Sequence, residues 1–211
     1  MPSTHSAIIC CAGIGSRLGL QTTKALLTLQ GHSLLYWQLK SLEGVEDVRI
    51  VVGFQAKEII REATSYRNDI LFVYNHDYFE NKTAASYYLG AKDGNPYAIE
   101  IDGDLIIHPD DMKRCLQEKG EWVAYTDIKT EDFTPIAIQN NQVTSFQADH
   151  TLFEWTGPCC LRKEKIKWSS GHVYDQITPY LPMKGIHIRA VDIDTDADYQ
   201  MAKKLAAEWF S

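Results

Sequence analysis

The chain has 211 residues, a length that suits one domain with a substantial core. Hydrophobic residues make up 45% of it and charged residues 23%, as in ordinary globular proteins. The formal net charge of −7 argues against a nucleic-acid partner, which would require a broad basic face, but it permits a nucleotide held by a few focused cations.

Cysteine usage and hydropathy set two further expectations. Five cysteines include the adjacent pairs Cys10-Cys11 and Cys159-Cys160, which lack the spacing of a zinc site. They suit small buried side chains in a reducing compartment. The sequence has neither a signal-like start nor an apolar run near eighteen residues. We therefore expect a cytoplasmic protein with no membrane partner.

The first half of the chain alternates strand-like and helix-like segments. Apolar runs predict strands at 7–11, 48–52, 70–74 and 97–101. Helical patterning predicts helices at 34–42, 56–63, 83–91 and 109–118, with Ser33 as a cap of the first and Pro109 opening the last. Such alternation is typical of βαβ units and a mostly parallel sheet.

The pattern changes after Gly120. Short strands are predicted at 122–126, 135–138, 143–148 and 156–161, with a turn at Asn140-Asn141. Helical patterning returns at 172–181, and one last strand is predicted at 186–193. Thr195 and Asp198 form a capping box that starts a C-terminal helix. We expect a single domain over residues 1–211, with an antiparallel extension at about 120–162.

A glycine-rich turn follows the first predicted strand. It carries Gly13, Gly15 and Arg17, and Lys24 stands seven residues after the arginine. Glycines let backbone N–H groups approach phosphate oxygens, and the two cations suit a triphosphate. The turn is not a P-loop, because neither glycine has Gly-Lys at the required offset. It is not a dinucleotide fingerprint, because Leu18 replaces the third glycine and no acid follows the next predicted strand.

The form Gly-x-Gly-x-Arg, followed by Thr23-Lys24-Ala25-Leu26-Leu27, resembles the nucleotidyltransferase family that includes the sugar-1-phosphate nucleotidylyltransferases. Within that family the chain is most similar to the small bacterial CTP:phosphocholine cytidylyltransferases. The family usually has proline where Thr23 stands. The resemblance fits the predicted order of elements over nearly the whole chain. It implies an α/β protein with a Rossmann-like three-layer α/β/α fold and a mostly parallel mixed central sheet.

Two acidic segments are candidates for a metal site. Asp102-Gly103-Asp104 follows the fourth predicted strand, and Asp192 and Asp194 lie near the end of the last one. From the residues alone, the first segment could be a solvated turn and Asp194 could be a helix cap. The resemblance implies that Asp104 and Asp194 hold Mg²⁺, an ion that accepts carboxylate oxygens. Because strand residues alternate, we expect Asp102 to face away.

A third segment carries Asn75, Tyr78, Asn81 and Ser86 at the spacing of the cytidylyltransferases that the chain resembles. Such side chains could hold the base, order a loop around the acceptor, or simply make turns and caps. For a phosphocholine acceptor, cation–π contact and nearby negative charge would be needed. The candidates for that cage are Tyr78, Tyr88, Trp122, Glu154 and Trp155. His76 and His108 lie nearest the expected site, and we interpret both as structural.

The resemblance implies a Mg²⁺-dependent transfer of CMP from CTP to a phosphate monoester or phosphonate such as phosphocholine, with release of pyrophosphate. Arg17 would bind the leaving phosphates and Lys24 the α-phosphate. The nucleotide-binding residues would be Ala12, Gly13, Ile14, Gly15, Ser16, Asn81 and Ser86. A sugar-1-phosphate nucleotidylyltransferase, a molybdopterin-type guanylyltransferase and a non-catalytic nucleotide-binding domain remain alternatives. The sequence does not name the acceptor, and a homodimer stays open.

Overall fold

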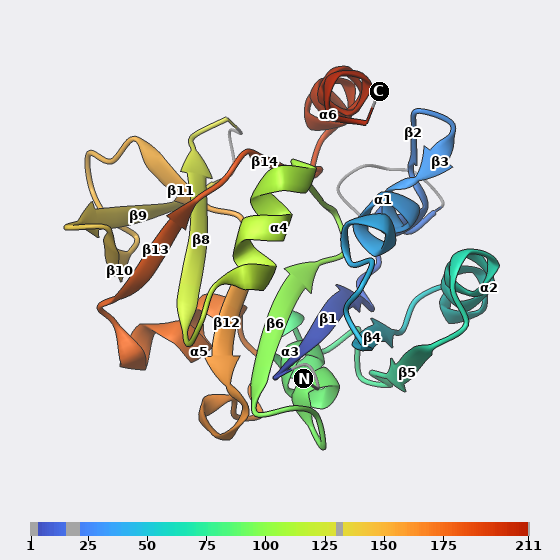
Figure 1. Ribbon diagram of the computed structural model, residues 1–211, viewed down its shortest axis with the longest axis horizontal. Helices are drawn as coiled ribbons and strands as arrows, with labels where there is room; N and C mark the ends of the chain where they lie inside the picture. Colours follow the sequence, from blue (N-terminus) through green and yellow to red (C-terminus); the bar gives the residue numbers. More distant parts are fainter. Residues whose placement is uncertain (1–3, 16–21, 130–132, 211) are drawn as a thin grey trace.

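The computed structural model describes residues 4–15, 22–129 and 133–210. Within these residues a ten-stranded mixed sheet runs across the molecule in the order β11-β9-β10-β13-β8-β12-β6-β1-β4-β5 (Figure 1). In that order the strands are Phe153–Trp155, Thr134–Gln139, Gln142–Phe146, Met183–His187, Trp122–Asp127, Cys159–Arg162, Tyr97–Asp102, His5–Cys11, Asp47–Val52 and Ile70–Tyr74. The predicted mixed sheet is confirmed.

The first half of the chain forms the parallel part of this sheet. Strand β1 lies between β4 and β6, and β4 lies beside β5, all in parallel register. The helices between them are α1 (Leu34–Ser41), α2 (Ala56–Tyr66), α3 (Thr83–Ala91) and α4 (Pro109–Gln117). All eight predicted elements of this half are present, with ends shifted by at most a few residues. Ser33 caps α1 as predicted, because its hydroxyl accepts from the Tyr36 N–H at 3.0 Å.

The second half continues the same sheet rather than forming a separate layer. Strand β12 pairs antiparallel with both β6 and β8, whereas β13 pairs parallel with β8. The added region is therefore mixed, and it includes β13, which lies beyond the expected range of 120–162. At the tight turn between β9 and β10, Asn140 and Asn141 both have positive φ, as that turn type requires. Strand β11 was not predicted.

The prediction of one strand at 186–193 is wrong. The segment divides into β13, in the large sheet, and β14 (Ala190–Asp192), which pairs antiparallel with the short strand β7 (Leu105–Ile107). The chain leaves one sheet for the other at Ile188 and Arg189. Continuous apolar patterning did not reveal this break, because residues on both sides of it are buried. The break sets the position of Asp194, since β14 leads into it.

Side chains alternate between two cores on the two faces of the sheet. Ile9 of β1 packs in a cluster with residues of α1, α2 and α4, including Leu35, Ile59 and Met112. Its neighbour Ile8 packs in a second cluster with residues of α3 and of α5 (Val173–Ile177). Because successive strand residues point to opposite faces, β1 is covered by helices on both. The three-layer α/β/α arrangement follows.

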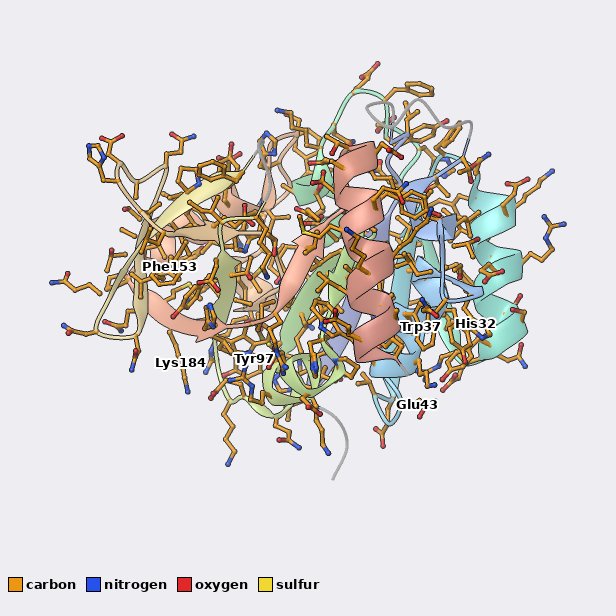
Figure 2. The ribbon with its side chains drawn as sticks, turned by 90° about the horizontal axis from the view of Figure 1, so that it is seen from above. His32, Trp37, Glu43, Tyr97, Phe153 and Lys184 are labelled. Carbon is orange, nitrogen blue, oxygen red and sulfur yellow. The ribbon has the colours of Figure 1, made fainter. Side chains whose placement is uncertain are left out.

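A third cluster docks the C-terminal helix α6 (Asp196–Trp209) beside α1. Trp37 stacks on Phe210 with ring centroids 4.1 Å apart, and it meets His32 edge-on at 5.5 Å. His32 opens β3 (His32–Ser33), which forms a small hairpin with β2 (Thr28–Leu29). Figure 2 shows Trp37 and His32 at one end of the molecule and Phe153 and Lys184 at the other. In the described part of the chain, the helices are too short or too polar to cross a bilayer.

The turn between β13 and β14 is fastened to α4 by one buried carboxylate. Asp111 accepts from the Arg189 backbone N–H at 2.9 Å and from Arg189 Nε at 2.8 Å, and it also accepts from Arg114 at 2.6 Å. Burial alone would raise the pKa of Asp111, but the two guanidinium groups outweigh it and hold the pKa at about 2. Asp111 therefore fixes the point from which β14 starts.

We predict that Asp111→Asn destabilises the protein by about 2 kcal/mol at pH 7, because it removes a buried charge-assisted anchor. Since the pKa is depressed, the stabilisation is present above the ordinary carboxyl pKa and is lost as the pH falls through about 2. Urea unfolding measures the difference. Asp110→Asn, in the same turn with its side chain 81% exposed, is the control and should change stability by less than about 0.5 kcal/mol. Equal effects of the two substitutions would contradict the prediction.

Candidate functional site

The site lies where the parallel strands β1 and β6 end. The segment after β1 is tied to its neighbours on both sides by backbone hydrogen bonds. Gly103 N–H donates to Cys10 O, and Phe54 N–H donates to Ala12 O, each at 3.1 Å. A side chain at Gly103 would approach Cys10 O to 2.7 Å, so glycine is needed for this close approach. The glycine turn and the Asp102–Asp104 turn are thereby held side by side.

Lys24 is positioned by a short helical turn, η2 (Lys24–Leu26), directly after Thr23. Thr23 has φ −64°, the value that a proline would impose, and its N–H donates to the Gln55 side chain at 2.8 Å. Thr23 thus has the φ angle that a proline would have, and it also makes a backbone N–H hydrogen bond that a proline could not make. On the other side, Gly15 has φ +65°, and a Cβ there would come within 3.0 Å of Lys24 Cγ.

The Lys24 ammonium bridges two carboxylates that are far apart in sequence. Its Nζ donates to Asp104 Oδ2 at 2.7 Å and also to Asp194 Oδ1. The two aspartates meet because β7 and β14 pair and because Ile193 N–H donates to Asp104 O at 3.2 Å. Burial alone would lower the pKa of Lys24, but Asp104 and Asp194 outweigh it and raise the pKa above the ordinary lysine value. Lys24 therefore stays charged at neutral pH.

Asp194 is held in place by the cap of the following helix. Thr195 and Asp198 form the predicted capping box, in which Asp198 N–H donates to Thr195 Oγ1 at 3.2 Å and Thr195 N–H donates to Asp198 at 2.8 Å. Asp198 also accepts from the Asp194 N–H at 3.2 Å. Thr195 is the N-cap residue, so the cap leaves the Asp194 side chain available for Lys24.

Further acids lie beneath this ion-pair cluster. Burial raises the pKa of Glu100, and burial together with Glu100 raises the pKa of Asp102. Burial and the nearby Asp104 likewise raise the pKa of Asp192. Asp102 lines the same cavities as Asp104, so the expectation that it faces away is wrong. Strand alternation ends at Asp102, because the chain turns through Gly103 before Asp104.

A first cavity, of about 250 Å³, opens over the glycine turn. Ala12, Gly13, Gly15 and Lys24 line it together with Asp102 and Asp104, opposite Asn75, Tyr78, Asn81 and Ser86. Asn75 is the centre of the second group: its Nδ2 donates to Asn81 at 2.8 Å and to the Ser86 hydroxyl at 3.1 Å. These three side chains both line the cavity and order the loop before α3.

A second cavity, of about 230 Å³, adjoins the first along Thr83, Asp102 and Asp104, which line both. Its other walls combine acids with aromatic rings, notably Glu154 and Trp155 of β11 and Tyr174 of α5. Phe133 and Asp192 also line it. Of the expected cage residues, Glu154 and Trp155 lie here and Tyr78 lies in the first cavity. Trp122 is fully buried in the core and is excluded.

The structure gathers most of the predicted site residues at one sheet edge. Arg17 and Ser16 lie outside the described residues, and Ile14 is not among those that line the first cavity. His108 caps α4 and meets Trp209 edge-on, and His76 stacks on Tyr74. Neither histidine is among the residues that line the two cavities. No pattern in the sequence pointed to His172, which lines the second cavity, or to Gln55, which anchors Thr23.

The donor set at Asp104 and Asp194 is compatible with a hard cation. Both carboxylates converge on one nitrogen atom, so their oxygens already lie close together. In the part of the chain that the structure describes, no three side chains of His, Cys, Asp or Glu converge on a common point. Two carboxylates suffice for Mg²⁺, which usually completes its shell with substrate phosphates and water.

Comparisons with known proteins agree with this architecture. The model of the MobA-like NTP transferase domain matches residues 7–153, more than half of the chain. Bifunctional protein GlmU of Wolinella succinogenes is 26% identical over 120 residues, which cover 56% of this chain and 28% of that protein. The chain thus matches little more than a quarter of the length of this curated relative.

Solved structures share the fold over nearly the whole chain. The inositol-1-phosphate CTP transferase from T. maritima superimposes with a TM-score of 0.82 and 18% identity, covering 99% of this chain and 96% of that one. CTP:phosphocholine cytidylyltransferase LicC from Streptococcus pneumoniae superimposes with a TM-score of 0.74 and 18% identity, covering 95% and 98%. The fold is thus the α/β fold of nucleotidyltransferases. The chain belongs to the MobA-like NTP transferase domain family.

The raised pKa of Glu100 leads to a prediction about stability. Because the folded protein retains the proton at a pH where the unfolded chain releases it, Glu100 costs stability as the pH rises above the ordinary carboxyl value. Glu100→Gln removes the ionisable group. We expect its stability relative to wild type to improve by about 1 kcal/mol or more between pH 5 and pH 8.5. Urea unfolding with EDTA present measures this, and parallel pH profiles of the two proteins would refute it.

Proposed function

We propose that this protein is a Mg²⁺-dependent cytidylyltransferase that transfers CMP from CTP to a small phosphate monoester or phosphonate bearing a cationic group, phosphocholine being the model acceptor. Family membership supports the reaction class. One observation carries the assignment to this site: a buried lysine joins two carboxylates beside a glycine turn, at the boundary of two adjoining cavities.

The reaction needs positioning and charge neutralisation rather than a covalent protein intermediate. An acceptor oxygen attacks the α-phosphorus, the bond from that phosphorus to the bridging oxygen breaks, and pyrophosphate leaves with the electron pair. The acceptor is already anionic near neutral pH, so no general base is required. Backbone N–H groups of Ala12, Gly13 and Gly15 would cradle the triphosphate in the first cavity.

Lys24 would neutralise charge that builds on the α-phosphate. Its ammonium is kept protonated by Asp104 and Asp194, and it can exchange these carboxylates for phosphate oxygens without leaving the cluster. The same two carboxylates would hold Mg²⁺. The ion would supply positive charge to the phosphates during displacement. Arg17 lies outside the described residues and is proposed on sequence grounds to bind the leaving phosphates.

We predict that Lys24→Met and Asp104→Asn each lower turnover by about a hundredfold or more, because each removes one electrostatic contact to the transition state. Lys24→Met leaves two carboxylates without their shared cation, so it could also reduce stability. Asp104→Asn keeps the shape of the side chain and removes one negative charge. Comparing the two variants therefore separates loss of catalysis from loss of folding. Pyrophosphate release is measured, with circular dichroism to verify the fold. Lys204→Met, on exposed α6 surface, is the control. Folded variants with near-normal rates would exclude this site.

The proposed acceptor class rests on the second cavity. Its walls bring together acids and aromatic rings, including Glu154, Trp155 and Tyr174. Such walls attract an ammonium group through the negative charge of the acids and through cation–π contacts with the aromatic rings. The preference for CTP is supported by two structural relatives whose names include CTP as the donor, the T. maritima and Streptococcus pneumoniae enzymes.

A pyrophosphate-release screen tests the donor and the acceptor together, with four NTPs against phosphocholine, phosphoethanolamine, 2-aminoethylphosphonate and glucose 1-phosphate. We expect CTP with a cationic acceptor to give the highest kcat/KM. The matched control is 3,3-dimethylbutyl phosphate, which copies the shape of phosphocholine without its charge. Its kcat/KM should be at least about tenfold lower. A preference for glucose 1-phosphate would instead favour a sugar-1-phosphate nucleotidylyltransferase, and GTP preference a guanylyltransferase. Nucleotide binding without pyrophosphate release would indicate a non-catalytic domain.

A further inference from the structure

The second cavity poses an electrostatic problem for an anionic acceptor. Its described lining includes five carboxylates, those of Asp102, Asp104, Glu154, Asp192 and Asp194, and no lysine or arginine. Burial raises the pKa of Asp102 and Asp192, but the remaining negative charge suits the ammonium end of the proposed acceptor and repels its phosphate or phosphonate end. Lys24 is already shared between Asp104 and Asp194. Lys24 and the proposed Mg²⁺ would both serve the triphosphate, so a further cation where the acceptor phosphate meets the nucleotide would offset the remaining repulsion.

Lys82 and His172 lie at that boundary. Lys82 lines the first cavity and His172 the second, and Lys82 Nζ is 2.7 Å from His172 Nε2. Thr83, which follows Lys82, lines both cavities. The contact thus joins Lys82, which lines the first cavity, to His172. Among the described residues that line the second cavity, His172 is the one that can become cationic. Burial and the Lys82 charge lower the pKa of His172, which favours the neutral ring that accepts from the ammonium.

Both residues are held by their surroundings. Lys82 N–H donates to Ser170 O at 3.0 Å, and Ala84 N–H donates to Gly171 O at 3.2 Å, so the start of α3 is joined to the segment that precedes His172. The His172 ring stacks on Tyr174, with ring centroids 4.8 Å apart and an angle of 10° between the ring planes. The backbone N–H of His172 donates to Asp175 Oδ2 at 2.8 Å, which fixes the chain where the ring starts. The imidazole is therefore a fixed acceptor that keeps the flexible lysine at the boundary of the cavities.

We propose that Lys82 binds the phosphate or phosphonate oxygens of the acceptor and that His172 is the positioning residue that holds it there. This inference rests on the proposed function and names the group that would recognise the anionic end of the substrate. An ammonium has three donors, so Lys82 can keep its contact with His172 while donating to the acceptor. The ammonium end of the acceptor would then meet the acidic walls of the second cavity, and its phosphate or phosphonate end would meet the Lys82 ammonium.

The test compares steady-state kinetics of wild type and Lys82→Met. We expect KM for phosphocholine to rise about tenfold, because one charge-assisted hydrogen bond is lost, and KM for CTP to change less than twofold. Lys92→Met, an exposed lysine after the other end of α3, is the matched control and should leave both values unchanged. His172→Ala should reproduce the rise in acceptor KM, and His172→Gln, which retains an acceptor atom, should largely reverse it.

Calorimetry with two probes separates anion recognition from general damage to the cavity. Phosphocholine should bind Lys82→Met about tenfold more weakly than wild type, whereas choline, which lacks the phosphate, should bind both proteins equally. An unchanged phosphocholine affinity, an equal loss for choline, or a rise in KM for CTP alone would overturn the proposal. These results require a wild type that releases pyrophosphate. A wild type with no such activity would instead refute the proposed function.

Discussion

The site depends on one interaction, the bridge from Lys24 to Asp104 and Asp194. Asp104 and Asp194 lie 80 and 170 positions after Lys24 in the chain, so the bridge can form only in the folded protein. Each part of the scaffold contributes to it. The pairing of β7 with β14 brings the two acids together, the capping box of α6 holds Asp194, and the Thr23–Gln55 hydrogen bond positions the lysine. In a buried setting, either carboxylate without its cation would be costly, so the three side chains stabilise one another.

The acids below this bridge show how the fold gathers ionisable carboxyl groups. Glu100 is fully buried in β6, Asp102 and Asp192 end β6 and β14 half-buried, and burial raises the pKa of each. Such groups reduce stability, and proteins retain them chiefly where function requires it. The arrangement suits a reaction that brings several phosphates and a divalent cation into one place. In the proposed reaction, the positive charge of the divalent cation would relieve the repulsion among the carboxylates.

The two cavities divide recognition between the halves of the chain. The first is built mainly from the parallel half, by the loops after β1, β5 and β6. The second is built largely from the later strands and α5, with Glu154 and Trp155 presented by β11. Asp102 and Asp104 belong to both. In the proposed reaction, the parallel half would supply the contacts to the nucleotide, and the other half would supply the walls that select the acceptor.

Local patterns in the sequence determined the parallel strands, their helices, the caps at Ser33 and Thr195, and the glycine turn with its lysine, because each depends on residues close together in the chain. The pairing of Asp104 with Asp194 was implied by the family resemblance and not by these patterns. Only the tertiary structure decided that the segment 186–193 breaks into two strands and that Asp102 faces the site. It alone revealed Gln55 and His172, whose contacts lie 32 and 90 residues away. Contacts of that kind leave no periodicity in the sequence, since they arise from how packed elements meet.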